Sequence, residues 1–276
     1  MNIIYIKRKI DRILAGSILK LSKRQRFVIS TFFLTISLIT TQLLQSNKIF
    51  LAIGFLALLT AIFTIWCLWE EITGVEYFTL LIPTVLYTVA VGLFYYLLPH
   101  RWITRLPIAF LYTVGIYALL LTQNIYNVAA IRTIALLRAA RAVNLLFSLI
   151  TFFLLLNTLF SFHLSSIINF FIVLGISYLM FLTSFWGEKL TPDIEKNILI
   201  ISQSLALLIA EIALVLSFWP LKVTFEALYL STICYTFLGI GQHKIKEMPF
   251  KKVIWEYIIL NILSLIMLIK TANWKI

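Results

Sequence analysis

The stretch IFLAIGFLALLTAIFTIWCLW, residues 49–69, decides the fold class. It carries no charged side chain over about 20 residues, the length of helix that crosses a bilayer. Its apolar residues are continuous, whereas the strands of a membrane barrel alternate apolar and polar residues in segments of about ten. In a bilayer a helix satisfies all of its backbone hydrogen bonds internally. The stretch is therefore predicted to be a transmembrane helix.

Similar stretches follow one another along the whole chain of 276 residues. The nine expected spans are 27–44, 49–69, 78–98, 103–121, 143–162, 164–185, 198–218, 223–240 and 253–269. The chain is 62% hydrophobic and only 12% charged, which excludes an ordinary soluble domain and a disordered chain. Its two cysteines, both in apolar stretches, exclude a disulfide scaffold. The sequence predicts an all-α polytopic transmembrane helix bundle.

The distribution of lysine and arginine predicts the orientation of this bundle. If the N-terminus is inside, the outer loops hold six of the 23 bases, namely Lys48, Arg101, Arg105, Lys222, Lys270 and Lys275, and 17 remain inside. Basic residues favour the cytoplasmic side of a membrane protein. We expect an inner-membrane protein with its N-terminus in the cytoplasm and its C-terminus outside. The net charge of +12 then indicates contact with an anionic inner leaflet rather than with nucleic acid.

Residues 1–26 form a basic segment before the first span. On a helical projection, one arc of about 140° holds seven aliphatic residues, namely Ile3, Ile6, Ile10, Ile13, Leu14, Ile18 and Leu21. Five bases lie opposite, namely Arg8, Lys9, Arg12, Lys20 and Lys23. The pattern is typical of an amphipathic helix lying in the plane of the inner leaflet. It can serve as a topology anchor or as a regulatory, partner-binding arm.

Residues 122–142 separate spans 27–121 from spans 143–276 and contain Arg132, Arg138 and Arg141. One interpretation is an interfacial helix whose arginines meet lipid phosphates. In the alternative, Arg132, which projects away from the other two, enters the bundle and holds an acidic group of the protein or of a ligand.

Part of this region resembles a known family. The residues LLP at 97–99, Arg101 and the run NIYNVAAIRT at 124–133 are similar to a family of uncharacterised bacterial multi-pass membrane proteins. That family has no assigned activity. The resemblance implies a bacterial membrane protein and transfers no site residue.

Glu211 is the most unusual polar residue inside an expected span. It lies roughly 10 Å from the nearer membrane surface, whereas Glu226 and Glu256 lie about one turn from a span end, where a side chain can reach the surface. Ser204 lies seven residues before Glu211 on nearly the same helix stripe, and Gln203 flanks it. Intramembrane carboxyl groups usually face protein or a water-filled cavity. Glu211 is therefore either part of a ligand site or a hydrogen-bonding contact between helices.

No motif indicates catalysis, a cofactor or a metal ion, since the three histidines have no HExxH or CxxC spacing around them. Our first hypothesis is transport or housing of a lipid or other amphipathic envelope ligand. Its candidate binding residues are Glu211, Gln203, Ser204, Arg132, Arg138 and Arg141. The alternatives are a non-catalytic scaffold that docks partners through its cytoplasmic loops and, third, a membrane-embedded transferase. The sequence names no protein partner.

Overall fold

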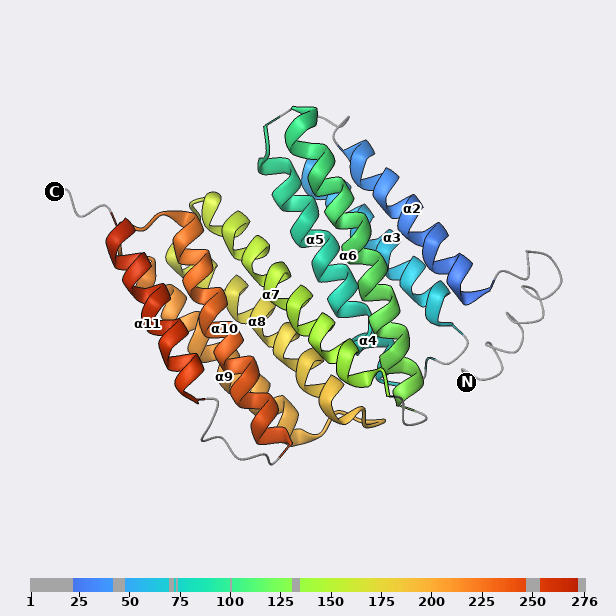
Figure 1. Cartoon of the computed structure of the whole chain (residues 1–276). Helices are drawn as coiled ribbons and strands as arrows, with labels where there is room; N and C mark the ends of the chain where they lie inside the picture. Colours follow the sequence, from blue (N-terminus) through green and yellow to red (C-terminus); the bar gives the residue numbers. More distant parts are fainter. Residues whose placement is uncertain are drawn as a thin grey trace.

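The computed structural model describes residues 22–41, 48–69, 72, 74–99, 101–130, 135–246 and 254–272. The regular structure in these ranges is entirely helical (Figure 1). The helices are α2 (Lys23–Thr40), α3 (Ile49–Leu68), α4 (Glu76–Thr79), α5 (Leu81–Leu97), α6 (Trp102–Ala129), α7 (Leu137–Ser161), α8 (Ser166–Lys189), α9 (Lys196–Leu216), α10 (Val223–Ile245) and α11 (Ile254–Thr271). The all-α polytopic bundle predicted from the sequence is confirmed.

Eight segments of the described chain are long and apolar enough to span a membrane: α3, α4 with α5, and each helix from α6 to α11. The first expected span corresponds to α2, which is 18 residues long but carries three bases, Lys23, Arg24 and Arg26, in its first turn. Ser22 caps this helix: its hydroxyl accepts from the Gln25 amide, and the Gln25 side chain accepts from the Ser22 amide. The capping box starts α2 within the basic segment, of which residues 1–21 lie outside the described chain.

The third expected span is broken near its beginning. Helix α4 ends at Thr79 and α5 begins at Leu81, with Pro83 as its third residue. Proline has no backbone N–H and therefore cannot donate to the carbonyl four residues earlier, which belongs to Thr79. Pro107, in contrast, lies inside α6 near its N-terminus, where the helix continues past it. Of the two prolines, only Pro83 lies beside a division between two helices.

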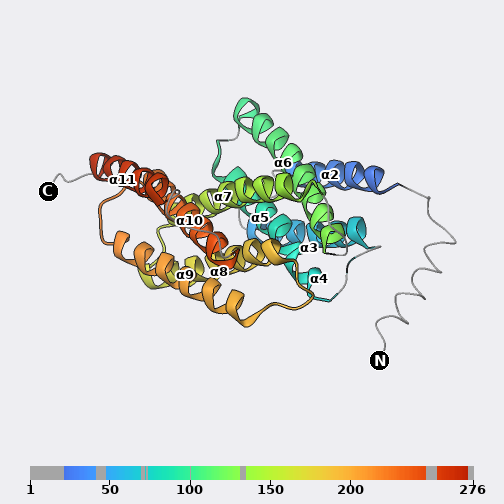
Figure 2. The same cartoon turned by 60° about the horizontal axis from the view of Figure 1, so that its bottom comes forward.

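Two groups of helices enclose two apolar cores. A third core, which includes Leu120 of α6 and Trp186 of α8, joins the two groups at one end. Helices α2, α3, α5 and α6 surround a core that includes Leu34, Leu56 and Tyr112. Helices α7, α8, α9 and α10 surround a second, larger core that includes Phe152 and Phe181. Figures 1 and 2 show α2 and α11 at opposite edges of the bundle, and α11 packs mainly against α10.

A chain of buried hydroxyl groups crosses the first group of helices. The Thr60 hydroxyl of α3 lies 3.2 Å from the Thr88 hydroxyl of α5, which lies 3.2 Å from the Tyr112 hydroxyl of α6. One turn away, Thr64 and Thr84 pair at 3.2 Å. All five side chains are fully buried. Such bonds hold helices together in a membrane, where lipid gives no hydrophobic preference for helix contacts.

We expect Thr88→Val to destabilise the protein by about 1 kcal/mol, because it keeps the side-chain shape but removes both interhelical hydroxyl contacts. The matched control is Thr232→Val, because the Thr232 hydroxyl bonds the Leu228 carbonyl of its own helix. That variant should lie within about 0.5 kcal/mol of wild type. Unfolding in a mixed-detergent titration measures both. Equal effects of the two substitutions would contradict a special contribution from the hydroxyl chain.

The structure divides residues 122–142 differently from the sequence analysis. Residues 122–129 continue α6 to Ala129, and residues 137–142 form the first turns of α7. In the described part of this segment, extensions of two long helices therefore stand where one interpretation placed a separate interfacial helix. The reason is visible in the packing: Gln123 and Asn127 are buried, and the Asn127 side chain donates to the Leu68 carbonyl of α3 at 3.4 Å. Burial of these amides against neighbouring helices keeps the end of α6 in the bundle.

Candidate functional site

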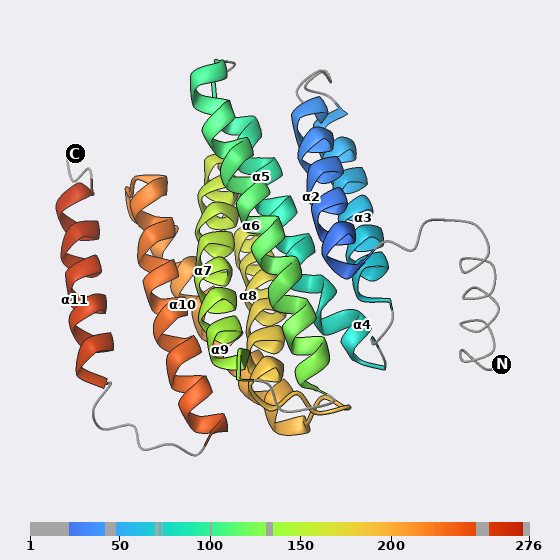
Figure 3. The ribbon, with the colours of Figure 1, turned by 45° about the vertical axis from the view of Figure 1, so that its right-hand side comes forward.

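A buried carboxylate joins three helices at one end of the bundle. Oε2 of Glu188 lies 2.9 Å from Nε of Arg141 and 2.7 Å from Nζ of Lys246. The Glu188 side chain is 2% exposed, while those of Arg141 and Lys246 are 27% and 30% exposed. Figure 3 shows the start of α7 and the ends of α8 and α10 at this end of the bundle. We call Arg141, Glu188 and Lys246 the ionic triad.

Helix ends explain why these three residues meet. Glu188 is the penultimate residue of α8, and Leu190 ends that helix in the left-handed conformation, with φ 55°. The last carbonyls of a helix have no partner within it. Arg141 provides donors for two of these carbonyls. Its Nη2 donates to the Glu188 carbonyl at 2.6 Å, and its Nε donates to the Gly187 carbonyl at 3.3 Å. A cation at a helix C-terminus also complements the helix dipole.

The ionic triad forms one wall of an open cleft with a volume of about 630 Å³. Its lining consists of Arg138, Arg141, Ala142, Leu145, Glu188, Gln242 and Lys246. Three bases and one acid give this lining a positive charge. Arg138 is exposed and forms no ion pair with any residue that the structure describes. The cleft combines charged groups at its rim with the apolar side chains of Ala142 and Leu145.

Two of the candidates from the sequence, Arg138 and Arg141, line this cleft together. Arg132 lies outside the described residues. Gln203, Ser204 and Glu211 lie elsewhere: all three are exposed on α9, Ser204 and Glu211 on the face opposite its buried residues Ala206 and Ala213, and Gln203 at the edge of that face. The structure therefore does not bring Glu211 together with the arginines. Of the other two carboxyls, Glu256 is exposed, as expected for a side chain that reaches the surface, but Glu226 is buried, with 8% exposed.

Sequence reasoning missed the roles of Glu188, Gln242 and Lys246. Glu188 and Lys246 lie beyond the ends of the expected spans 164–185 and 223–240, whereas the structure extends α8 to Lys189 and α10 to Ile245, the residue before Lys246. The available signal was an acid three residues after a predicted span end, next to Gly187. A glycine there has a packing reason, since a Cβ at Gly187 would lie 3.3 Å from the Tyr126 ring.

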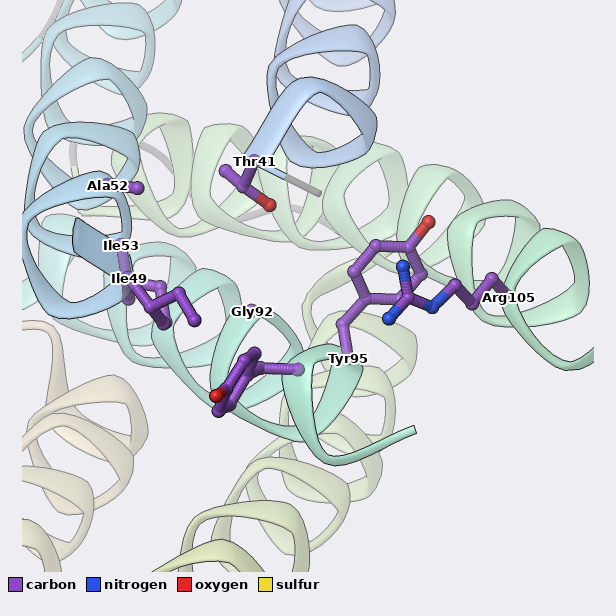
Figure 4. Close-up of a pocket in the computed structure, with 8 residues that line it drawn as sticks. Thr41, Ile49, Ala52, Ile53, Gly92, Tyr95 and Arg105 are labelled. Atoms are coloured by element: carbon purple, nitrogen blue, oxygen red, sulfur yellow. The ribbon is translucent and has the colours of Figure 1, made fainter. Parts of the chain in front are cut away.

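A buried arginine, Arg105, lies near the start of α6. Arg105 of α6 is 5% exposed and donates to the carbonyls of Leu98 and Pro99, each at 3.2 Å. Its guanidinium lies 5.5 Å from the centre of the Tyr95 ring, as the close-up in Figure 4 shows. The adjoining cavity measures only about 20 Å³, room for about one water molecule. Arg105 therefore ties the turn after α5 to α6.

Among the residues that the structure describes, no three His, Cys, Asp or Glu side chains gather as a metal site would require. The comparisons add no relative: no family model matches the chain, and neither does any curated protein or solved structure. The resemblance of residues 97–133 to a bacterial family thus remains a resemblance without a matching family model. The chain is a multi-pass membrane-type helical protein, and its function has to be argued from the cleft.

Proposed function

We propose that the protein binds a phosphate-bearing amphipathic ligand, most simply an anionic phospholipid, in the cleft beside the ionic triad. The observation that carries this proposal is the positive lining of that cleft. Arg138 is free of ion pairs in the described chain, while Arg141 and Lys246 are only partly neutralised by the one carboxylate that they share. Arginine is suited to phosphate because its planar guanidinium presents several donors at once.

The size and position of the cleft support a lipid rather than a small ion. A volume of about 630 Å³ lies in the usual range of about 300–1,000 Å³ for small-molecule sites. Its bases lie at helix ends, at the level expected for lipid head groups, whereas Leu145 lies one turn farther along α7 toward the apolar part of that span. With the predicted orientation, this end of the bundle faces the anionic inner leaflet.

The ionic triad would hold the binding residues in place before the ligand arrives. Arg141 is fixed by the Glu188 carboxylate and by two carbonyls of α8, and Lys246 by the same carboxylate. Pre-positioned side chains lose less conformational entropy on binding. Arg138, which is exposed, would close on the phosphate. The proposal concerns binding, and movement of the ligand across the membrane would require a second conformation.

The test compares Arg138→Gln with Lys244→Gln in protein reconstituted into nanodiscs. Lys244 is exposed near the same end of α10 but does not line the cleft. Both variants lose one positive charge. A ligand at a hundred times its Kd stabilises the native state by about 2.7 kcal/mol. Replacing part of the phosphatidylcholine with phosphatidylglycerol should therefore raise the melting temperature of wild type and of Lys244→Gln, and raise that of Arg138→Gln much less.

A further arm adds inorganic phosphate alone to phosphatidylcholine nanodiscs. If phosphate reproduces the whole stabilisation, the ligand is the free anion and not the lipid. Equal stabilisation of both variants by phosphatidylglycerol would show a general surface-charge effect and overturn the proposed site. That outcome would favour the scaffold hypothesis, in which the basic surface docks partners.

A further inference from the structure

Helix α9 exposes a polar stripe that the bundle does not use. Its buried face contains Ser202, Ala206, Ile209 and Ala213, which are 1% exposed or less. Its opposite face carries Ser204 and Glu211, and Gln203 lies at the edge between the two faces; all three are exposed. Glu211 lies five residues before the helix end at Leu216, roughly 8 Å along the axis, and Gln203 lies deeper still. These groups therefore face the hydrocarbon layer if α9 borders lipid.

Lipid is a poor neighbour for such a face. A carboxyl or amide group that faces hydrocarbon loses hydrogen bonds to water and gains none, so polar residues inside spans almost always contact protein or a cavity. In α9 the contact is not provided by the described helices. The stripe therefore points to a helix of another molecule.

The spacing of the stripe identifies the kind of helix that fits. The stripe residues are Asn197, Ile200, Ser204, Leu207, Glu211 and Leu214, which are exposed except for the partly buried Leu214. Their separations alternate between three and four residues, the heptad pattern of helices that wrap around each other at a small angle. The bundle-facing residues of α9 lie outside this pattern, so burial within the chain does not explain it.

The chemistry of the stripe favours a second copy of the same chain. Asn197, Ser204 and Glu211 are seven residues apart and so occupy the same position in three successive heptads. In a parallel pair related by a two-fold axis along the membrane normal, each residue meets its own copy at the same depth. Amide groups carry both a donor and an acceptor, and a carboxyl group can hydrogen-bond to a second carboxyl group. The stripe is thus complementary to itself.

Ser204 also lets the two helices approach closely. Its hydroxyl donates to the Ile200 carbonyl within α9 at 2.8 Å, so its hydrogen is already satisfied and its small side chain adds little bulk. Small residues at such positions are typical of helix contacts in membranes. Ile200 and Leu207, which are 62% and 42% exposed, would pack between the polar layers.

We infer that the protein forms a parallel dimer through the exposed face of α9, with Asn197, Ser204 and Glu211 meeting their copies along the interface. The proposal is independent of the ligand cleft, because it depends on α9 alone.

Disulfide cross-linking between single cysteines tests this interface. With Cys67 and Cys234 replaced by alanine, Leu207→Cys places a thiol in the interface, and Leu58→Cys, on the 64% exposed side chain of α3, is the control. Purified protein in phosphatidylcholine vesicles is treated with a mild oxidant. We expect covalent dimers with Leu207→Cys and few with Leu58→Cys. Equal cross-linking at both positions overturns the second-copy interface. The same oxidation is repeated in whole membranes, and cross-linking of Leu207→Cys only to other proteins there also overturns it.

A second measurement keeps the native cysteines. Single-molecule photobleaching of a fluorescent fusion in the same vesicles counts the chains in each particle. Glu211→Leu should weaken dimerisation about three- to twentyfold, the effect of removing one interhelical polar contact, whereas Glu211→Gln should stay close to wild type. Monomers in wild type at every protein density overturn the proposal.

Discussion

Glu188→Gln is expected to destabilise the protein by about 3 kcal/mol. The substitution keeps the size of the side chain but leaves Arg141 and Lys246 without their shared anion. Removing one partner of a buried ion pair costs about 3–5 kcal/mol, because the remaining charge stays poorly solvated. We expect the lower end of that range because the two basic side chains are 27% and 30% exposed, and water screens part of their repulsion.

An exposed ion pair nearby provides the matched control. Nζ of Lys189 lies 2.7 Å from Oε2 of Glu195, the same separation as in the Lys246 pair, but both side chains are 36% exposed. Glu195→Gln should change the free energy of unfolding by about 0.5 kcal/mol or less. Titration with a denaturing detergent, followed by tryptophan fluorescence, gives both values. Equal losses would show that burial does not strengthen the triad.

A double variant separates charge repulsion from lost packing. Glu188→Gln combined with Lys246→Gln removes one of the two orphaned charges, so it should be more stable than Glu188→Gln alone. The coupling between the two substitutions measures the interaction directly. Additive losses in the double variant would mean that the carboxylate stabilises the fold through other contacts.

Gly115→Ala should cost about 2 kcal/mol, because a Cβ at this position of α6 would overlap the hydroxyl and ring of Tyr87. Tyr87 is 3% exposed and has little room to move. Its hydroxyl donates to the Leu111 carbonyl at 3.1 Å, and its ring stacks on Tyr112 with 5.9 Å between centroids. A shift of Tyr87 would weaken both contacts and part α5 from α6.

Gly54→Ala is the control for this prediction. Gly54 lies in the interior of α3, and a Cβ there would meet nothing within 4 Å. Alanine is the better helix former, so this variant should equal wild type or gain up to about 1 kcal/mol. Thermal unfolding in detergent compares the two. A Gly115→Ala protein as stable as Gly54→Ala would show that Tyr87 repacks without loss.

The positions of single residues around the helix axis were harder to predict than the helices. Glu211 was expected to face protein or a cavity because of its depth, and within the single chain the structure exposes it on α9. The small residues Ala206, Ala210 and Ala213 decide this, since they let α9 approach its neighbours closely and turn the larger polar side chains outward. A hydropathy pattern in which both faces are apolar carries little information on which face is buried.

The sequence by itself determined that the chain forms a bundle of membrane-length helices, and placed their boundaries within several residues. The physical reason is local: about 20 uncharged apolar residues in succession have to be helical in a bilayer, whatever their neighbours. It also identified Arg138 and Arg141 as candidates. Only the tertiary structure decided that Glu188 and Lys246, far apart in the chain, meet Arg141 around one cleft. That convergence depends on how α7, α8 and α10 pack, which is set by side-chain shapes along all three helices.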